Sequence, residues 1–377
     1  MKKQNLVLLL LAGLYISLLF YYGITNLRPA QAAERPFEPL LSVFRLIRSE
    51  YIEEKNPLET MDGALRGLVN SLDPFSGYLN QKATALYLEQ QKESVLYDVG
   101  ILVMKRYGFF PMIVGFIPDS QAQKQDIKVG DYITEINGES TSALSLTEIR
   151  LLLRSKQKSS LTLKTLRGEK TQIISLERER ILANPYTFRS QPGTSGWLEI
   201  YGFFSPLTND FIKKIIPRLG RSKEPFIIDL RAAQEGQLDE AIRFLNQFIN
   251  GEKIIIYRGR NDETQVFGCP QNPSVPDLNL VVWVSSATQD LAELVAGVLQ
   301  EKKKAPVIGY STPGLVAKRE FFLLRDGSSF FLTTAIGGIY PDKLLWNKGI
   351  EPNIKLNPDE NNSSVYLQKT LQLQSLP

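Results

Sequence analysis

The sequence predicts an α/β protein that also carries a small β-rich domain and an apolar N-terminal segment. Between residues 183 and 357, continuous apolar runs alternate with helical patterns, as expected for strands that are buried on both faces of a sheet. Between residues 94 and 182, short strands surround one short helix, which indicates a small, partly open barrel. Residues 6–24 contain no charged side chain and are long enough to cross a bilayer as a helix.

The composition excludes several classes of active site. The 377 residues include no histidine and a single cysteine, Cys269. Histidine-dependent triads and dyads, histidine-ligated metals, cysteine-rich zinc sites and intramolecular disulfides are therefore excluded. We expect no cofactor and no metal, and the formal net charge of +4 is too small to indicate a nucleic-acid partner. The composition does not exclude an active site in which a neutral lysine acts as the base for a serine nucleophile.

The first 33 residues have the features of an export signal. Lys2 and Lys3 precede the apolar run, and a small-residue cleavage pattern ends at Ala32. Residues 1–33 are therefore expected to be either a signal peptide or an uncleaved membrane anchor, and the length of the run favours the anchor. By the positive-inside rule, the rest of the chain is extracytoplasmic. We expect it in the periplasm or cell envelope, tethered to the inner membrane or secreted after cleavage near Ala32.

Four segments follow this signal. Residues 34–93 are expected to be helical, because apolar side chains recur there with helical spacing. Residues 94–182 form the β-rich domain, and residues 183–357 form the α/β core. Residues 358–377 are a polar tail that we expect to be poorly ordered.

Three stretches resemble bacterial peptidases that contain a PDZ domain. VGILV (99–103) and VGFIPDSQAQKQDIKVGDYITEINGES (114–140) match the PDZ pattern, and LDPFSGYL (72–79) resembles the element that precedes it in the C-terminal processing, or tail-specific, serine peptidases. PDZ domains add a peptide as an extra strand and hold its C-terminal carboxylate on loop amides. The resemblance therefore implies a domain that binds C-terminal or unfolded segments of envelope proteins.

The same resemblance implies a peptide-binding groove in residues 94–182. The residues expected to form it are Tyr97, Asp98, Val99, Gly100, Ile101, Ile149 and Leu153. Ile149 and Leu153 fit a plain role in the core at least as well. Asp98 stands where the family usually has glycine, so its charge predicts weaker or altered binding of a peptide carboxylate.

The α/β core resembles the peptidase domain of this family, which implies a crotonase-like β-β-α fold. The matching stretches, in family order, are FIIDLRAAQEGQ, SATQDLAELVAGVLQE, VIGYSTPGLV and FLTTAIGGIYPD. The family serine falls on Asp290, its lysine on Leu315 and a glutamine four residues later on Arg319. The segment that helps to shape the oxyanion site contains Ala233 and Glu235.

These substitutions predict that the chain has no catalytic residues. Leu315 cannot accept a proton, and Asp290 has no hydroxyl and would repel the oxyanion. Glu235 would add a second repulsive charge if it lies near that site. Instead, Asp290 is expected to cap the following helix, with Glu293 completing an Asp-x-x-Glu capping box.

The sequence thus predicts an exported, membrane-associated pseudoprotease that acts through its PDZ domain as an adaptor or regulator in the cell envelope. The membrane contact is residues 6–24, and we expect assembly with further copies or with an active paralogue. One alternative is an active serine endopeptidase with a relocated dyad of Ser286 and Lys318. Another is a purely structural subunit of an envelope complex.

Overall fold

The computed structural model describes residues 37–93, 96–180, 184–219, 223–270, 278–357 and 362–373. The membrane segment expected at residues 6–24 lies outside these ranges. Within them, no helix is both long enough and apolar enough to span a membrane. The chain divides into two units, Met1–Ala64 and Leu65–Pro377.

The described part of the first unit is helical. It contains α3 (Glu38–Glu50) and the first half of α4 (Pro57–Asn70). Proline suits the first turn of a helix, because its fixed φ is helical and the missing N–H has no partner there in any case. None of the α3 residues is buried. In the second unit, the segment predicted to be helical continues with a short strand, β1 (Gly77–Leu79), and then α5 (Gln81–Gln90).

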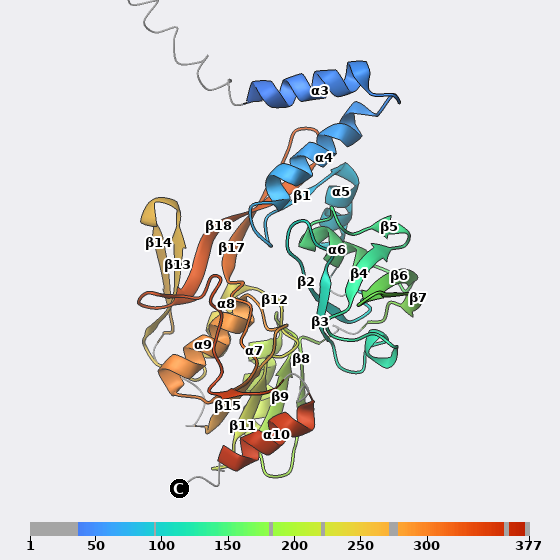
Figure 1. The fold of residues 1–377 in the computed structure, drawn as a ribbon. Helices are drawn as coiled ribbons and strands as arrows, with labels where there is room; N and C mark the ends of the chain where they lie inside the picture. Colours follow the sequence, from blue (N-terminus) through green and yellow to red (C-terminus); the bar gives the residue numbers. More distant parts are fainter. Residues whose placement is uncertain are drawn as a thin grey trace, which may run out of the picture. The chain divides into compact units, whose positions relative to one another are not determined.

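The β-rich domain is a six-stranded sheet that encloses one helix, α6 (Leu146–Leu153) (Figure 1). Its strands are β2 (Ile101–Met104), β3 (Met112–Phe116), β4 (Tyr132–Ile136), β5 (Glu139–Ser140), β6 (Ser160–Arg167) and β7 (Lys170–Glu177). The order is β2-β3-β4-β6-β7, with β5 paired to β4. A capping box between Ser145 and Glu148 starts α6. Alternate residues of β6, Leu161 and Leu163, are buried, so the sheet closes over one apolar cluster.

The α/β core is built on a mostly parallel sheet with the order β20-β16-β15-β11-β9-β8. Its strands are β8 (Tyr186–Arg189), β9 (Gly196–Ile200), β11 (Phe226–Asp229), β15 (Leu280–Val284), β16 (Val307–Gly309) and β20 (Ile354–Lys355). Only β8 runs antiparallel to its neighbour. Every residue of β9, β11, β15 and β16 is buried, as expected for strands that are covered on both faces, and β15 and β16 are continuous apolar runs.

A second sheet has β18 (Ser329–Ile339) at its centre. β18 pairs with β1, with β13 (Lys253–Gly259), with β17 (Ala317–Leu323) and with β19 (Lys343–Leu344), and β13 also pairs with β14 (Thr264–Gly268). All of these pairs are antiparallel. Through β17, this sheet brings Arg319 beside Asp290 of the core.

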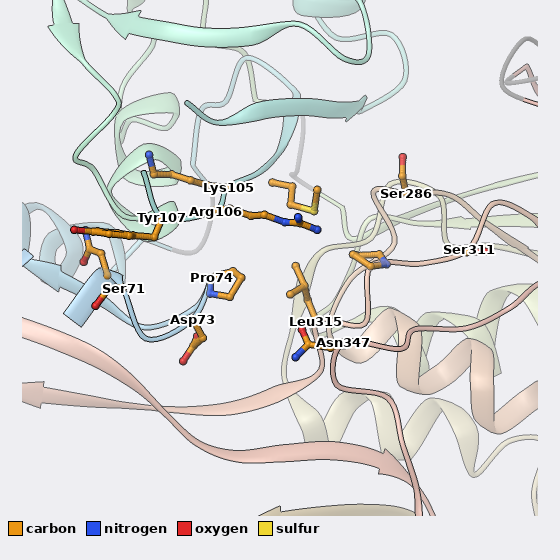
Figure 2. Close-up of a pocket in the computed structure, with 13 residues that line it drawn as sticks. Ser71, Asp73, Pro74, Lys105, Arg106, Tyr107, Ser286, Ser311, Leu315 and Asn347 are labelled. Carbon is orange, nitrogen blue, oxygen red and sulfur yellow. The ribbon is translucent and has the colours of Figure 1, made fainter. Parts of the chain in front are cut away.

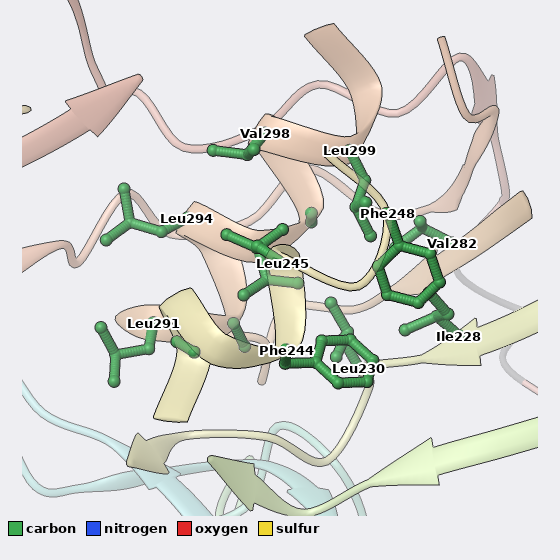
Figure 3. Close-up of a cluster of buried hydrophobic side chains, with 14 of the residues drawn as sticks. Ile228, Leu230, Phe244, Leu245, Phe248, Val282, Leu291, Leu294, Val298 and Leu299 are labelled. Atoms are coloured by element: carbon green, nitrogen blue, oxygen red, sulfur yellow. The ribbon is translucent and has the colours of Figure 1, made fainter. Parts of the chain in front are cut away.

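Helices α8 (Leu238–Leu245) and α9 (Leu291–Lys303) pack on one face of the parallel sheet (Figure 3). Phe244 and Leu245 of α8 meet Leu294 and Val298 of α9 in a cluster that contains Ile228. Burying one such side chain contributes about 1.5–3 kcal/mol. Shorter elements, α7 (Leu207–Asp210), β10 (Gly202–Phe203) and β12 (Glu235–Gly236), complete this layer, and β10 and β12 pair in parallel.

The expectation of a poorly ordered tail is wrong for residues 362–373. They contain α10 (Ser363–Gln372), which packs on the opposite face of the parallel sheet. Tyr366 is fully buried, and its hydroxyl donates to the carbonyl of Val284 at 2.9 Å. The indole of Trp283 donates to Thr370 at 2.9 Å. Two buried side chains on successive turns are too few to give the tail a clear apolar pattern.

Candidate functional site

The corner between β15 and α9 has a strained backbone at Asp290. This residue has φ 55° and ψ −120°, which costs free energy for any residue that carries a Cβ. Sharp strand-to-helix turns carry the nucleophile in many hydrolases. Upstream, Thr288 anchors the turn by donating to the carbonyl of Leu230 at 3.0 Å. The main chain at Asp290 therefore makes a strained strand-to-helix turn, and the side chain at this turn is a carboxylate.

The capping box predicted at Asp290 and Glu293 is wrong. The Asp290 side chain accepts no hydrogen bond from the helix amides, because a residue that caps a helix has extended backbone angles, not a positive φ. Glu293 instead accepts hydrogen bonds from the Thr312 hydroxyl and from the amides of Gly314, at 2.7 Å, and Leu315, at 2.8 Å. Burial raises the pKa of Glu293 to about 7. Glu293 thus ties α9 to the segment that carries Leu315.

The Asp290 carboxylate is buried beside Arg319. Its Oδ2 lies 3.6 Å from Nη2 of Arg319, and its Oδ1 has no hydrogen-bond partner within the described part of the chain. Burial raises the pKa of Asp290 to about 6, although Arg319 and the Ala317 amide act in the opposite direction. The Arg319 guanidinium also lies over the ring of Phe75, 4.6 Å from its centroid.

Leu315 is adjacent to Asp290 through the main chain. The Asp290 amide donates to the carbonyl of Leu315 at 3.0 Å. The Leu315 side chain is 4% exposed and belongs to the apolar cluster of the β-rich domain, together with Phe75 and Ala317. The two positions are therefore side by side, as a catalytic pair would need, but one side chain is an anion and the other an alkyl group.

Glu235 is compensated by two arginines of the β-rich domain. Its carboxylate lies 2.8 Å from Nη1 of Arg154 and 3.4 Å from Nη1 of Arg150. Burial by itself favours the protonated acid, but the two guanidinium groups hold the pKa of Glu235 at about 2. Ala233, in the same loop, is fully buried, and its carbonyl accepts the Gln289 amide at 3.1 Å. The Glu235 charge is thus balanced, not left as a free repulsive charge.

Arg150 and Arg154 were not identified from the sequence. Arg150 also donates to the side-chain oxygens of Gln234, at 3.2 Å, and Gln289, at 3.3 Å. Burial lowers the pKa of Arg150 to about 10. The available signal was two arginines four residues apart, one within the mostly apolar α6 and the other directly after it.

The residues of the predicted peptide-binding loop are hydrogen-bonded to other parts of the same chain. Tyr97 and Asp98 form isolated bridges with Ser155 and Glu179. Asp98 accepts the Gly100 amide on Oδ1 at 2.7 Å and Nε of Arg154 on Oδ2 at 3.0 Å. Four further predicted residues are buried together in the apolar cluster of this domain, namely Val99, Ile101, Ile149 and Leu153.

A cavity of about 440 Å³ opens beside Leu315 (Figure 2). Its lining residues are Asn70, Ser71, Asp73, Pro74, Met104, Lys105, Arg106, Tyr107, Ser286, Ser311, Pro313, Leu315 and Asn347. Figure 2 shows the exposed Arg106 side chain reaching into this space. Lys105 donates to the carbonyls of Phe109, Thr141 and Ser142 at 2.7 to 2.9 Å. Burial lowers its pKa to about 8, but these three bonds require the ammonium form.

The serines before Asp290 have different surroundings. Ser285 donates to the carbonyl of Arg231 at 2.8 Å and accepts the Ala287 amide at 3.0 Å, as expected for a serine that satisfies backbone groups. Ser286 lines the cavity, whereas Lys318 does not and lies 3.6 Å from Glu320 on its own strand.

Among the residues that the structure describes, no acidic or cysteine cluster is arranged to hold a metal ion.

The comparisons with known proteins agree with this architecture. Residues 194–356 match the model for peptidase family S41, and residues 112–167 match the model for a PDZ domain. The chain is 27% identical over 336 residues to the carboxy-terminal processing protease CtpA of Bacillus subtilis (strain 168), covering 88% of this chain and 72% of that protein. The chain is therefore similar to the C-terminal processing peptidases, and its residues 194–356 match peptidase family S41.

Two further proteins are similar to this chain. A probable CtpA-like serine protease of Staphylococcus aureus (strain MRSA252) is 25% identical over 323 residues, which cover 84% of this chain and 64%, less than two thirds, of that protein. The structure of the photosystem II D1 C-terminal processing protease superposes with a TM-score of 0.68 at 18% identity, over 88% of this chain and 95% of that one. This last likeness concerns the fold alone.

Proposed function

We propose that this chain is a pseudoprotease of the C-terminal processing peptidase family that binds C-terminal or unfolded segments of envelope proteins. The observation that carries the proposal is the pair Asp290 and Leu315, whose main chains are hydrogen-bonded to each other. Hydrolysis by a serine and a lysine needs a hydroxyl nucleophile and a neutral amine. Neither group is present at these positions, and Arg319 holds the Asp290 carboxylate as part of an ion pair.

Two features support a binding role for such a protein. The cavity beside Leu315 combines an apolar lining, including Met104 and Pro313, with the cationic head of Arg106. An apolar side chain of a bound polypeptide would contact the apolar lining, and an anionic or carbonyl group would contact Arg106. In addition, β2 is at the edge of its sheet and pairs only with β3 among the described strands. Its outer edge is the one on which a PDZ domain adds a peptide strand.

The proposal includes a location. Residues 6–24 are expected to hold the protein at the inner membrane, or cleavage near Ala32 releases it, so the PDZ domain and core act outside the cytoplasm. Partners there are envelope proteins with accessible C-terminal segments. Further copies of this chain, or an active paralogue, are the proposed assembly partners.

The test uses the full-length protein in detergent and labelled decapeptides with apolar C-termini. Fluorescence anisotropy measures binding, and mass spectrometry of the same samples measures cleavage. We expect saturable binding without cleavage, and no covalent labelling by a fluorophosphonate, which reacts with activated serines.

Two results would overturn the proposal. Turnover that Ser286→Ala abolishes would establish a relocated active site. The matched control is Ser311→Ala, because Ser311 lines the same cavity but donates its hydroxyl to Glu351 at 2.9 Å. Absence of both binding and cleavage would instead favour a purely structural subunit.

A further inference from the structure

The carboxylate-binding loop of the PDZ domain contains a carboxylate of its own. Asp98 is 5% exposed, and its Oδ1 accepts the Gly100 amide at 2.7 Å. In PDZ domains, amides of this loop hold the C-terminal carboxylate of the bound peptide. Asp98 therefore places on the loop the same chemical group that a ligand would bring.

The main chain of Asp98 is fixed independently of its side chain. Its amide donates to the carbonyl of Glu179 at 2.8 Å, and the Glu179 amide donates back to the carbonyl of Asp98 at 2.9 Å. Tyr97 exchanges the corresponding two bonds with Ser155, at 2.8 and 2.9 Å. The loop can therefore keep its shape when the Asp98 side chain moves or is removed.

A guanidinium completes this site. Arg154 follows the last residue of α6, and its Nε donates to Oδ2 of Asp98 at 3.0 Å. On its other side, Nη1 of Arg154 donates to Glu235 of the peptidase-like core at 2.8 Å. One cation thus already faces two carboxylates. A third anion that approached the Gly100 amide would find this donor already bonded to Asp98 and the charge of Arg154 already compensated.

We propose that Asp98 is a built-in competitor for the C-terminal carboxylate of a polypeptide. The Gly100 amide and Arg154 form a carboxylate site, and the Asp98 side chain must leave it before a peptide C-terminus can bind. This inference rests on the proposed function, because it names the group that the PDZ domain recognises and the residue that limits its affinity. An amidated peptide lacks that group and does not compete with Asp98.

The experiment measures binding to the full-length protein by fluorescence anisotropy. The probe is a fluorescein-labelled decapeptide that ends in leucine, as the free acid and as the C-terminal amide. Asp98→Ala and Asp98→Gly are expected to bind the free acid at least about tenfold more tightly than the unmodified protein, since charge-assisted hydrogen bonds are strong. The amide is expected to gain little.

Asp131→Ala is the matched control. Asp131 is a buried aspartate of the same domain that accepts the Lys128 amide at 2.9 Å and Nε of Arg167 at 2.7 Å, away from the carboxylate loop. The Asp131→Ala variant also loses one hydrogen bond from a backbone amide and one ion pair with an arginine, and we expect its peptide affinity to be unchanged. Circular dichroism verifies that each variant is folded, and the two Asp98 variants guard against a local defect in either one.

Three outcomes would overturn the inference. If the unmodified protein and both Asp98 variants bind the free acid equally, Asp98 is not a competitor, although the proposed function stands. If the variants gain equally for acid and amide, the freed site does not recognise a carboxylate. If no protein binds either peptide, the inference and the proposed function fail together.

Discussion

Oδ2 of Asp290 lies 3.6 Å from Nη2 of Arg319. In the family resemblance, these two positions belong to the serine nucleophile and to a glutamine four residues beyond the lysine. Each looks like an independent loss in the sequence, yet in the fold they compensate each other's charge. Without Arg319, Asp290 would be an unpaired carboxylate that is 6% exposed, and isolated buried charges are costly. The charges of Asp290 and Arg319 are therefore paired within the fold.

Asp290→Asn should remove part of the pH dependence of stability. The folded state raises the pKa of Asp290 from 3.8 to about 6 and so binds this proton more tightly than the unfolded state does. The contribution to stability is present below about pH 4, falls as the pH rises to about 6 and stays absent above it, amounting to about 3 kcal/mol at most. Urea unfolding between pH 4 and 8 measures this difference between variant and parent.

Glu293 titrates in a neighbouring pH range and is coupled to Asp290. Burial raises the pKa of Glu293 to about 7 and the Asp290 charge adds to that shift, so the comparison of the two proteins also includes a smaller change at Glu293. Arg319→Gln should have the opposite effect to Asp290→Asn, lowering stability at pH 8 more than at pH 4. Parallel curves for the parent and Asp290→Asn would show that the buried carboxylate does not titrate as described.

Asp290→Gly should be more stable than Asp290→Ala by about 1–2 kcal/mol, because φ is 55° at this position and only glycine adopts that angle without strain. Both variants lack the charge, so the comparison isolates the backbone. Thermal unfolding at pH 7 provides the measurement. Equal melting temperatures would mean that the corner relaxes in the variants and that no strain is held there.

The sequence predicted several strands of the core from apolar runs between turn signals, and β15 is an example. It also assigned the family's serine and lysine positions to Asp290 and Leu315, which stays a prediction; the structure joins the main chains of these two residues by a hydrogen bond. Both predictions rest on local patterns, which a sequence displays directly.

The remaining features of the site depend on distant partners. A positive φ at Asp290 is imposed by the corner, so the local Asp-x-x-Glu pattern gave the wrong cap. The ion pairs of Glu235 join segments more than 80 residues apart in the chain. The contact of Tyr366 with Val284 spans 82 residues. The spacing of apolar residues within one segment carries no information about contacts with a distant segment.

Leu315→Lys should destabilise the protein by about 2–5 kcal/mol. Its side chain lies in the apolar cluster with Phe75 and Ala317, and an ammonium placed there loses its hydration. Leu315→Met conserves the volume and should cost less than about 1.5 kcal/mol. Urea unfolding at pH 7 distinguishes these values. If both variants are equally stable, position 315 is open to solvent and the cluster is not closed around it.

Tyr366 tests whether α10 is part of the core and not a tail. Tyr366→Ala removes a fully buried ring that packs 5.2 Å from the Trp283 ring, and should cost about 3–5 kcal/mol. Tyr366→Phe removes only the hydroxyl bond to Val284, leaving that carbonyl without its donor, and should cost about 1–3 kcal/mol. Trp283 fluorescence during unfolding reports the same site.

Lys369→Ala, on the same helix, is the control and should change stability by less than about 0.5 kcal/mol. Unfolding curves for Tyr366→Ala that overlay those of the parent would return α10 to the status of a dispensable tail.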